Sequence, residues 1–370
     1  MDTTTEFDIP ASIAATLVDA RAYADDRIQD AYRWLRANNP LGIARVEGFD
    51  PFWVVTRHAD VLAVSRRNDL FHNADRSTTL TTKGMEERAR KITGQPNLIR
   101  SLVQMDAPDH PKYRALTQGW FMPANLTKFE ARVRTIARSA VTRIAERGGR
   151  CDFVTDVALG YPLHVLMEIL GVPEQDEPRM LMLTQQLFGP QDPDTARVRE
   201  ALTPEQFGAM IVSIIDDFGA YFAGITADRR VNPRDDLATV IANAKINGDY
   251  LPKHDATSYY VIVAADTELD TRSIARGDWL MLCYASANRD EAVFDEPYQF
   301  RSDRKPNRHL AFGYGAHLCL GQYLARMEMR ILFEELLPRL KSLLLDGEPK
   351  MTQATFVNGP KRLPIRFELA

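Results

Sequence analysis

The sequence predicts a mainly α-helical protein with small β-sheets. Most apolar residues recur three and four positions apart, which is the spacing of amphipathic helices. Strand-like runs are short and occur near residues 52 and 279 and in the C-terminal tail. No linker rich in Gly, Ser or Pro divides the 370 residues. We therefore expect a single domain over residues 1–370.

The first half of the chain combines predicted helices with one strand. An early helix has Ala31, Trp34 and Leu35 on its apolar side, and a short strand over 52–56 follows it. The predicted helices here are 25–38, 58–66, 112–121, 126–147 and 153–170, the last of which ends at Gly171. Residues 68–100 are polar and irregular, so we expect them to form a mobile loop over a pocket.

The second half continues as helices and then changes pattern. The predicted helices are 178–188, 204–226, 235–244, 257–265 and 321–340. Residues 257–265 are apolar all round, as expected of a helix that crosses the centre of the molecule. Residues 266–278 are typical of a hairpin that turns at Gly277 before a strand over 279–284. The tail, 347–369, is typical of short strands.

Composition excludes several classes of protein. The chain is 45% hydrophobic and 26% charged with a formal net charge of -4, which is an ordinary soluble, globular profile. No basic run indicates nucleic-acid binding. The N-terminus is polar and acidic, and no stretch has the length of a membrane span, so we expect no signal peptide and no membrane insertion. A cytoplasmic location is expected.

The three cysteines lie far apart in the sequence and show no metal-binding spacing. This excludes a disulfide framework and fits a reducing cytosol. We interpret Cys151 and Cys283 as ordinary core or strand residues. Cys319 differs, because it lies in the glycine-rich run 312–321 (FGYGAHLCLG) and a strong predicted helix follows at once.

This run has the properties needed to present a thiolate to a flat metal macrocycle. Gly313, Gly315 and Gly321 carry no Cβ atoms and permit positive φ, so the backbone can wrap around the sulfur. The N-terminus of the following helix favours the thiolate over the thiol. Phe312 and Leu318 would keep water away. The pattern predicts a cysteinate axial ligand to haem iron; the alternative is a buried structural cysteine in a turn.

An aromatic residue, spaced glycines, His317 two positions before Cys319 and Leu-Gly after it resemble the cysteine-ligand loop of the cytochrome P450 family. The resemblance extends from about Tyr23 to Phe367 and is closest to the bacterial, soluble, terpineol-hydroxylating branch. It implies the cytochrome P450 fold and heme b (iron protoporphyrin IX), with Cys319 as metal ligand and Phe312, Gly313 and Gly321 against the cofactor.

A second run, 105–114 (MDAPDHPKYR), resembles the propionate-binding helix of the same family. His110 and Arg114 stand four positions apart on a predicted helix and therefore lie on one face. By resemblance these two residues bind the haem propionates, and His317 joins them. On its own, such a pair is more often part of a solvated face.

The resemblance also implies the reaction. It predicts a monomeric monooxygenase that uses dioxygen and electrons from a ferredoxin and ferredoxin reductase. The substrate would be small and apolar: a terpenoid, a steroid side chain, or an aromatic or alkyl compound. An apolar pocket is expected from residues 68–100, Phe188 and residues 261–265. The basic residues Arg304, Lys305, Arg308, Arg326 and Arg330 would form either a ferredoxin-docking face or a solvated surface.

The sequence departs from the family after residue 265. The family's central helix normally continues into an acid–threonine pair, and a later helix carries Glu-x-x-Arg. Here the helix runs directly into Asp266 and Thr267, which the pattern favours as part of a strand. We predict that a block of about 55–60 residues is missing at 265/266, which is far longer than a typical loop. No catalytic residue is therefore assigned.

This shortening has expected physical consequences. Arg304 would lose its Glu-x-x-Arg partner, which costs on the order of 3–5 kcal/mol if the guanidinium is buried. Leu324, Met327 and Ile331 would face water or a collapsed gap. Three hypotheses follow: an active monooxygenase, a haem-binding but catalytically impaired protein, or a non-functional remnant of a deletion or a gene-model error.

Overall fold

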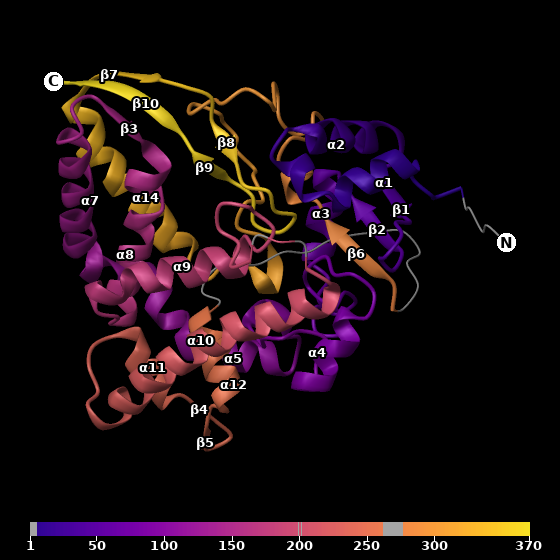
Figure 1. Ribbon diagram of the computed structural model, residues 1–370, viewed down its shortest axis with the longest axis horizontal. Coiled ribbons are helices and arrows are strands. Elements are labelled where there is room, and N and C mark those ends of the chain that lie inside the picture. Colours follow the sequence, from indigo (N-terminus) through magenta and orange to yellow (C-terminus); the bar gives the residue numbers. More distant parts are fainter. Residues whose placement is uncertain (1–5, 199, 201, 262–276) are drawn as a thin grey trace. The chain divides into compact units, whose positions relative to one another are not determined.

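The computed structural model describes residues 6–198, 200, 202–261 and 277–370. It is mainly helical with small sheets, as predicted (Figure 1). The chain groups into two compact units. The first contains Met1–His110 and Ala264–Cys319, and the second contains Pro111–Val263 and Leu320–Ala370.

The first unit is built on a three-stranded sheet of order β1-β2-β6. β1 (Leu41–Ala44) and β2 (Phe52–Val55) are antiparallel, whereas β6 (Trp279–Leu282) runs parallel to β2 with Trp279 opposite Phe52. The helices of this unit are α1 (Ala11–Val18), α2 (Arg27–Asn38), α3 (His58–Ser65), α4 (Met85–Thr93) and α13 (Tyr284–Ala287).

β2 is buried on both faces, which explains its continuous run of apolar residues. Phe52 and Val54 belong to one core cluster with Leu35 of α2. Trp53 and Val55 belong to a second cluster, which includes apolar residues of α3. Since successive side chains of a strand point to opposite faces, β2 separates the two clusters and supports both.

The second unit combines helices with small sheets. Its helices are α5 (Asp109–Gln118, which begins in the first unit), α6 (Pro123–Leu126), α7 (Glu130–Ala145), α8 (Gly160–Leu170), α9 (Glu177–Phe188), α10 (Pro204–Val231), α11 (Leu237–Asn243), α12 (Lys253–Val261) and α14 (Gln322–Leu336). β3 (Arg150–Asp152), β10 (Pro364–Leu369) and β7 (Leu340–Leu345) form an antiparallel sheet in that order. Two further strand pairs are β4 (Lys245–Ile246) with β5 (Asp249–Tyr250), and β8 (Lys350–Met351) with β9 (Pro360–Arg362).

α14 packs along α7, contrary to the expectation that its apolar face would be exposed (Figure 1). Leu324, Met327 and Ile331 are buried. At the edge of this contact, Arg134 of α7 forms ion pairs with Glu334 and Glu335 of α14. The prediction of an uncovered helix was wrong because α7 supplies the covering surface.

Arg304 also differs from the expectation. It is half-buried, and its guanidinium donates hydrogen bonds to the backbone carbonyls of Asp295, Glu296 and Gln299. These carbonyls replace the carboxylate partner that the sequence lacks. The predicted penalty of a buried, unpaired guanidinium therefore does not arise.

Other helices and strands differ from their predicted boundaries. Residues 68–100 contain the helix α4, whereas an irregular loop was predicted. The predicted strand 279–284 ends at Leu282, because Tyr284 begins α13. α12 begins at Lys253, before the predicted start at 257. The expected continuation of that helix over 262–265 and the hairpin over 266–276 lie outside the described residues.

One helix contradicts the expectation that no segment is long enough to span a membrane. Glu205–Val231, within α10, is long and apolar enough by length and composition, and 33% of its most apolar window is buried. A single helix of this kind is weak evidence for membrane insertion, since core helices have the same composition.

Candidate haem site

The loop that carries Cys319 is closed by backbone hydrogen bonds. The amide of Cys319 donates to the carbonyl of Phe312 at 2.8 Å, and the amide of Gly313 donates to the carbonyl of Leu310 at 2.9 Å. Between them, Gly315–His317 forms a single 3₁₀ turn. Cys319 is half-buried at the end of this loop, three residues before α14 begins. These backbone hydrogen bonds fix the main chain that carries the Cys319 side chain.

Two glycines are needed for this geometry. Gly313 and Gly315 have φ of 67° and 72°, a region that other residues adopt with strain. A Cβ atom on Gly315 would also lie 1.8 Å from the carbonyl oxygen of Ser65, at the end of α3. Gly321 was expected to share this conformation, but its φ is -84° and a Cβ there would meet nothing within 4 Å.

Two histidines predicted for the propionates lie together. The rings of His110 and His317 have centroids 4.3 Å apart and an interplanar angle of 46°. His110 is 5% exposed and His317 is 3% exposed. His110 lies in the first turn of α5, where its amide donates to the carbonyl of Asp106. Burying two imidazoles side by side provides polar groups that suit carboxylates at this point of the fold.

The other predicted site residues are Arg114, Phe312 and Gly321, and each lies on or next to an element or loop described above. Arg114 lies one turn beyond His110 on α5 and is half-buried. Phe312 is half-buried, and its ring centroid lies 5.9 Å from that of His309. Gly321 precedes the first residue of α14.

Two supporting residues could not be found from the sequence. Ser65 lies directly against Gly315, and its hydroxyl donates to the carbonyl of Val61. Asp106, in the run before α5, accepts a hydrogen bond from the amide of Ala74 at 2.8 Å. Ser65 belongs to no motif, and Asp106 lies in the run 105–114 but its contact with Ala74 depends on a segment distant in sequence.

The remaining cysteines match the interpretation as core or strand residues: Cys283 is buried, and Cys151 is half-buried on β3. Burial raises the pKa of the Cys283 thiol to about 12. Burial, together with Asp156 and Asp152, raises the pKa of Cys151 to about 11. Both side chains are therefore neutral thiols at physiological pH and poor metal ligands. Within the described ranges, no group of three or more His, Cys, Asp or Glu side chains could hold a bare metal ion.

Comparisons with known proteins identify the family. The cytochrome P450 family model matches residues 257–367. The chain is 42% identical to cytochrome P450-terp of a Pseudomonas species, over 98% of this chain and 99% of that protein. It is 27% identical to linalool 8-monooxygenase of Pseudomonas putida, over 93% of this chain and 96% of that protein.

A solved structure agrees with these matches. The crystal structure of CYP108D1 from Novosphingobium aromaticivorans has a TM-score of 0.86 and 39% identity, and covers 98% of this chain and 100% of that chain. This chain belongs to the cytochrome P450 family. Its class is therefore that of the oxidoreductase monooxygenases, and the family's cofactor is haem.

The comparison with cytochrome P450-terp also bears on the predicted shortening. The alignment spans 422 positions, whereas this chain has 370 residues, so at least 52 positions have no counterpart here. Because the alignment reaches nearly the full length of both chains, the missing positions are mostly internal. The predicted junction at 265/266 lies outside the described residues.

Proposed function

We propose that this chain binds heme b (iron protoporphyrin IX) through Cys319 and hydroxylates a small apolar substrate with dioxygen. The observation that carries the proposal is the closed loop around Cys319, with Gly315 packed on Ser65. The donor set fits haem, because one thiol suits the iron and the adjacent buried imidazoles suit the propionates. When bound, haem supplies the iron at which dioxygen is activated.

Each site residue then has a defined task. Cys319 would ligate the iron as a thiolate, and Phe312 would exclude water from its sulfur. Gly313 and Gly321 would let the macrocycle approach the backbone, since neither places a side chain there. Charge-assisted hydrogen bonds from Arg114, with His110 and His317, would hold the propionates.

The names of the relatives guide the choice of substrate. They include a linalool 8-monooxygenase, a steroid C26-monooxygenase and a methyl-branched lipid omega-hydroxylase. All three names describe oxidation of largely apolar molecules. We extend this to a terpenoid, a steroid side chain, or an aromatic or alkyl compound as substrate of this chain.

We further propose one cytochrome P450 domain over residues 1–370, acting as a cytoplasmic monomer that receives electrons from a ferredoxin and its reductase. Arg326 is our candidate for docking an acidic ferredoxin, because it is an exposed cation on α14, four residues after Gln322, where that helix begins behind the Cys319 loop. Arg330 is paired with Glu130 and Glu334. Arg326→Glu should slow reduction by ferredoxin; an unchanged rate would exclude Arg326 from docking.

A second candidate is a haem-binding protein that does not turn over. It is favoured by the missing alignment positions, at least 52 in number. The acid–threonine pair and the Glu-x-x-Arg helix expected of the family would lie within such a block. Without them the chain would hold haem but lack proton delivery.

Product formation tests these candidates. The purified chain, with a surrogate ferredoxin and reductase, is incubated with linalool and a panel of apolar substrates. Hydroxylated product from the wild type and from Cys151→Ser, but none from Cys319→Ser, supports the monooxygenase. Peroxide release without product supports the impaired haem protein. A chain that aggregates or retains no haem is a non-functional remnant.

A further inference from the structure

α12 carries more buried polar groups than its sequence indicated. Residues 257–265 were predicted to form a helix that is apolar all round, yet Thr257 and Ser258 are buried polar residues. Asp255, which precedes the predicted range, is buried as well. The Ser258 hydroxyl is satisfied within the helix by the carbonyl of His254. The Asp255 carboxyl lies 3.6 Å from Nδ1 of His254 on the same helix. It also has a donor from another element, and such donors matter because a buried carboxyl without hydrogen bonds is costly.

Tyr113 of α5 supplies that donor. Its hydroxyl donates to Oδ2 of Asp255 at 2.5 Å. One turn further along α12, the hydroxyl of Tyr259 donates to the backbone carbonyl of Tyr113. The rings of Tyr113 and Tyr259 are stacked, with centroids 6.0 Å apart and an interplanar angle of 13°. Residues of α12 therefore bind both the side-chain hydroxyl and the main-chain carbonyl of Tyr113.

Holding Tyr113 in this way constrains the whole of α5. Tyr113 lies on α5 between His110 and Arg114, and it immediately precedes Arg114 in the sequence. A side-chain contact restrains rotation of the helix about its axis, and a main-chain contact restrains sliding along it. The direction in which α5 presents its neighbouring side chains therefore depends on α12.

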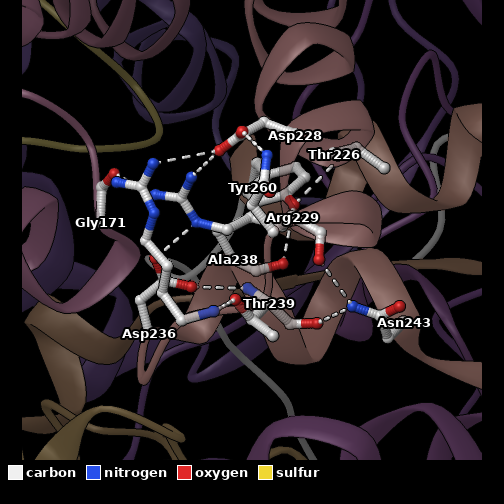
Figure 2. Close-up of polar contacts among 11 residues, drawn as sticks. Gly171, Thr226, Asp228, Arg229, Asp236, Ala238, Thr239, Asn243 and Tyr260 are labelled. Carbon is white, nitrogen blue, oxygen red and sulfur yellow. Dashed lines mark hydrogen bonds and ion pairs between the residues drawn. The ribbon is translucent and has the colours of Figure 1, made fainter.

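α12 is itself anchored on its other side, at Tyr260. The Tyr260 hydroxyl lies 3.3 Å from the hydroxyl of Thr226 and 3.4 Å from the carbonyl of Ala238 (Figure 2). Its ring stacks on Phe222 of α10, with centroids 4.2 Å apart. α12 is thereby fixed to α10 and α11.

Tyr260 lies beside a hydrogen-bond network centred on Arg229 of α10 (Figure 2). Figure 2 shows the Arg229 guanidinium within a ring of polar groups. Arg229 is 4% exposed, and donates to Asp236 of the α10–α11 connection at 2.6 Å and to the carbonyl of Gly171 at 2.9 Å. A Cβ at Gly171, whose φ is 70°, would lie 2.2 Å from Asp236, so only glycine allows this close approach. Charge-assisted hydrogen bonds among buried groups make this anchor strong.

We propose that Asp255 and Tyr259 are positioning residues: they fix α5 on α12 and thereby set the orientation of Arg114 and His110 toward the haem propionates. This rests on the proposed function, in which α5 binds the propionates. No step of the oxygen chemistry is assigned to either residue. Their contribution is to retain haem in the protein.

The test compares four variants of the full chain. Tyr113→Phe removes one hydroxyl, Asp255→Leu removes the acceptor, and Asp255→Asn keeps an acceptor oxygen without the charge. Tyr221→Phe is the matched control, because it breaks a tyrosine–aspartate hydrogen bond of the same kind, to Asp176 at 2.8 Å. Amide hydrogen exchange of α5 and the rate of haem dissociation are measured for each.

We expect Tyr113→Phe and Asp255→Leu to speed exchange of the α5 amides by at least about tenfold, and to speed haem dissociation in parallel. In Asp255→Asn, α5 exchange and haem dissociation should stay close to the wild-type rates. Tyr221→Phe should change neither rate. Exchange in Asp255→Leu no faster than in Tyr221→Phe would overturn the inference. A wild type that binds no haem would refute the proposed function, while the exchange comparison would still decide whether α12 positions α5.

Discussion

The imidazole rings of His110 and His317 lie 4.3 Å apart between centroids, although the two residues are remote in sequence. One ring belongs to the first turn of α5 and the other to the 3₁₀ turn just before Cys319. Their contact joins the two runs of sequence for which a common cofactor was expected. A polar pair buried to this degree is unusual in a core unless it serves a ligand or a specific network.

Gly315 should be irreplaceable, whereas Gly321 should not. Gly315→Ala would place a Cβ 1.8 Å from the carbonyl of Ser65 at a φ of 72°. Overpacking and backbone strain together should lower the free energy of unfolding by about 2–5 kcal/mol. Gly321→Ala is the control, since its φ is negative and its surroundings are open. Urea unfolding of the full chain measures both; equal losses would contradict the loop geometry.

Glu328 should make stability fall as pH rises. It is buried on α14, and burial raises its pKa from 4.5 to about 8. Between these two values the unfolded chain has lost the proton that the folded chain keeps, so the free energy of unfolding decreases as pH increases. Above about pH 8 the penalty is constant.

Glu328→Gln removes this proton linkage. The variant should be more stable than the wild type at pH 7, by up to about 3 kcal/mol, and the gain should vanish near pH 4. Glu348→Gln, at an exposed position, is the control and should give no such trend. Urea unfolding at a series of pH values measures the difference. A gain that does not depend on pH would show that Glu328 is not a buried acid.

The β8–β9 pair should depend on a buried ion pair. Asp192 is fully buried and accepts hydrogen bonds from Lys361 at 2.9 Å and from the amide of Gln353 at 2.9 Å. Lys361→Met would leave this carboxylate without its cation and should cost about 3–5 kcal/mol of stability. Lys350→Met, at an exposed position on β8, should cost much less.

A second carboxyl paired with Lys361, that of Asp194 at 2.8 Å, predicts an acid dependence. A hydrogen bond and the charge of Lys361 hold the pKa of Asp194 below its usual 3.8. The ionised Asp194 therefore contributes fully to the free energy of unfolding above about pH 4, and this contribution is lost as pH falls through the lowered pKa. Thermal unfolding of wild type and Lys361→Met should converge as pH is lowered below 4. Curves that stay equally far apart would exclude this linkage.

Much of the fold could be predicted from the sequence, because long amphipathic helices bury periodic apolar faces. β2, α3, α9 and the end of α8 at Gly171 lie close to their predicted bounds. α4 was missed because Ala89 is its only buried residue, so it has no apolar stripe to detect. Periodicity records which face is buried and carries no information about what covers it.

The candidate site shows the same limit. The loop motif predicted the positive φ of Gly313 and Gly315, but not the negative φ of Gly321. The packing of Gly315 on Ser65 and the hydrogen bond from Tyr113 to Asp255 could not be predicted, since each joins segments far apart in sequence. The expected consequences of the missing block were wrong for α14 and for Arg304, because neighbouring groups took over the covering and pairing roles.

The central claim is that this shortened chain still holds haem through the Cys319 thiolate. The most direct measurement is the carbon monoxide difference spectrum of the reduced, purified protein, for wild type and Cys319→Ser. Thiolate ligation by Cys319 should give a strongly red-shifted Soret band for the wild type and no such band for the variant. A band at the position of neutral thiol or histidine ligation, or no bound haem, would contradict it.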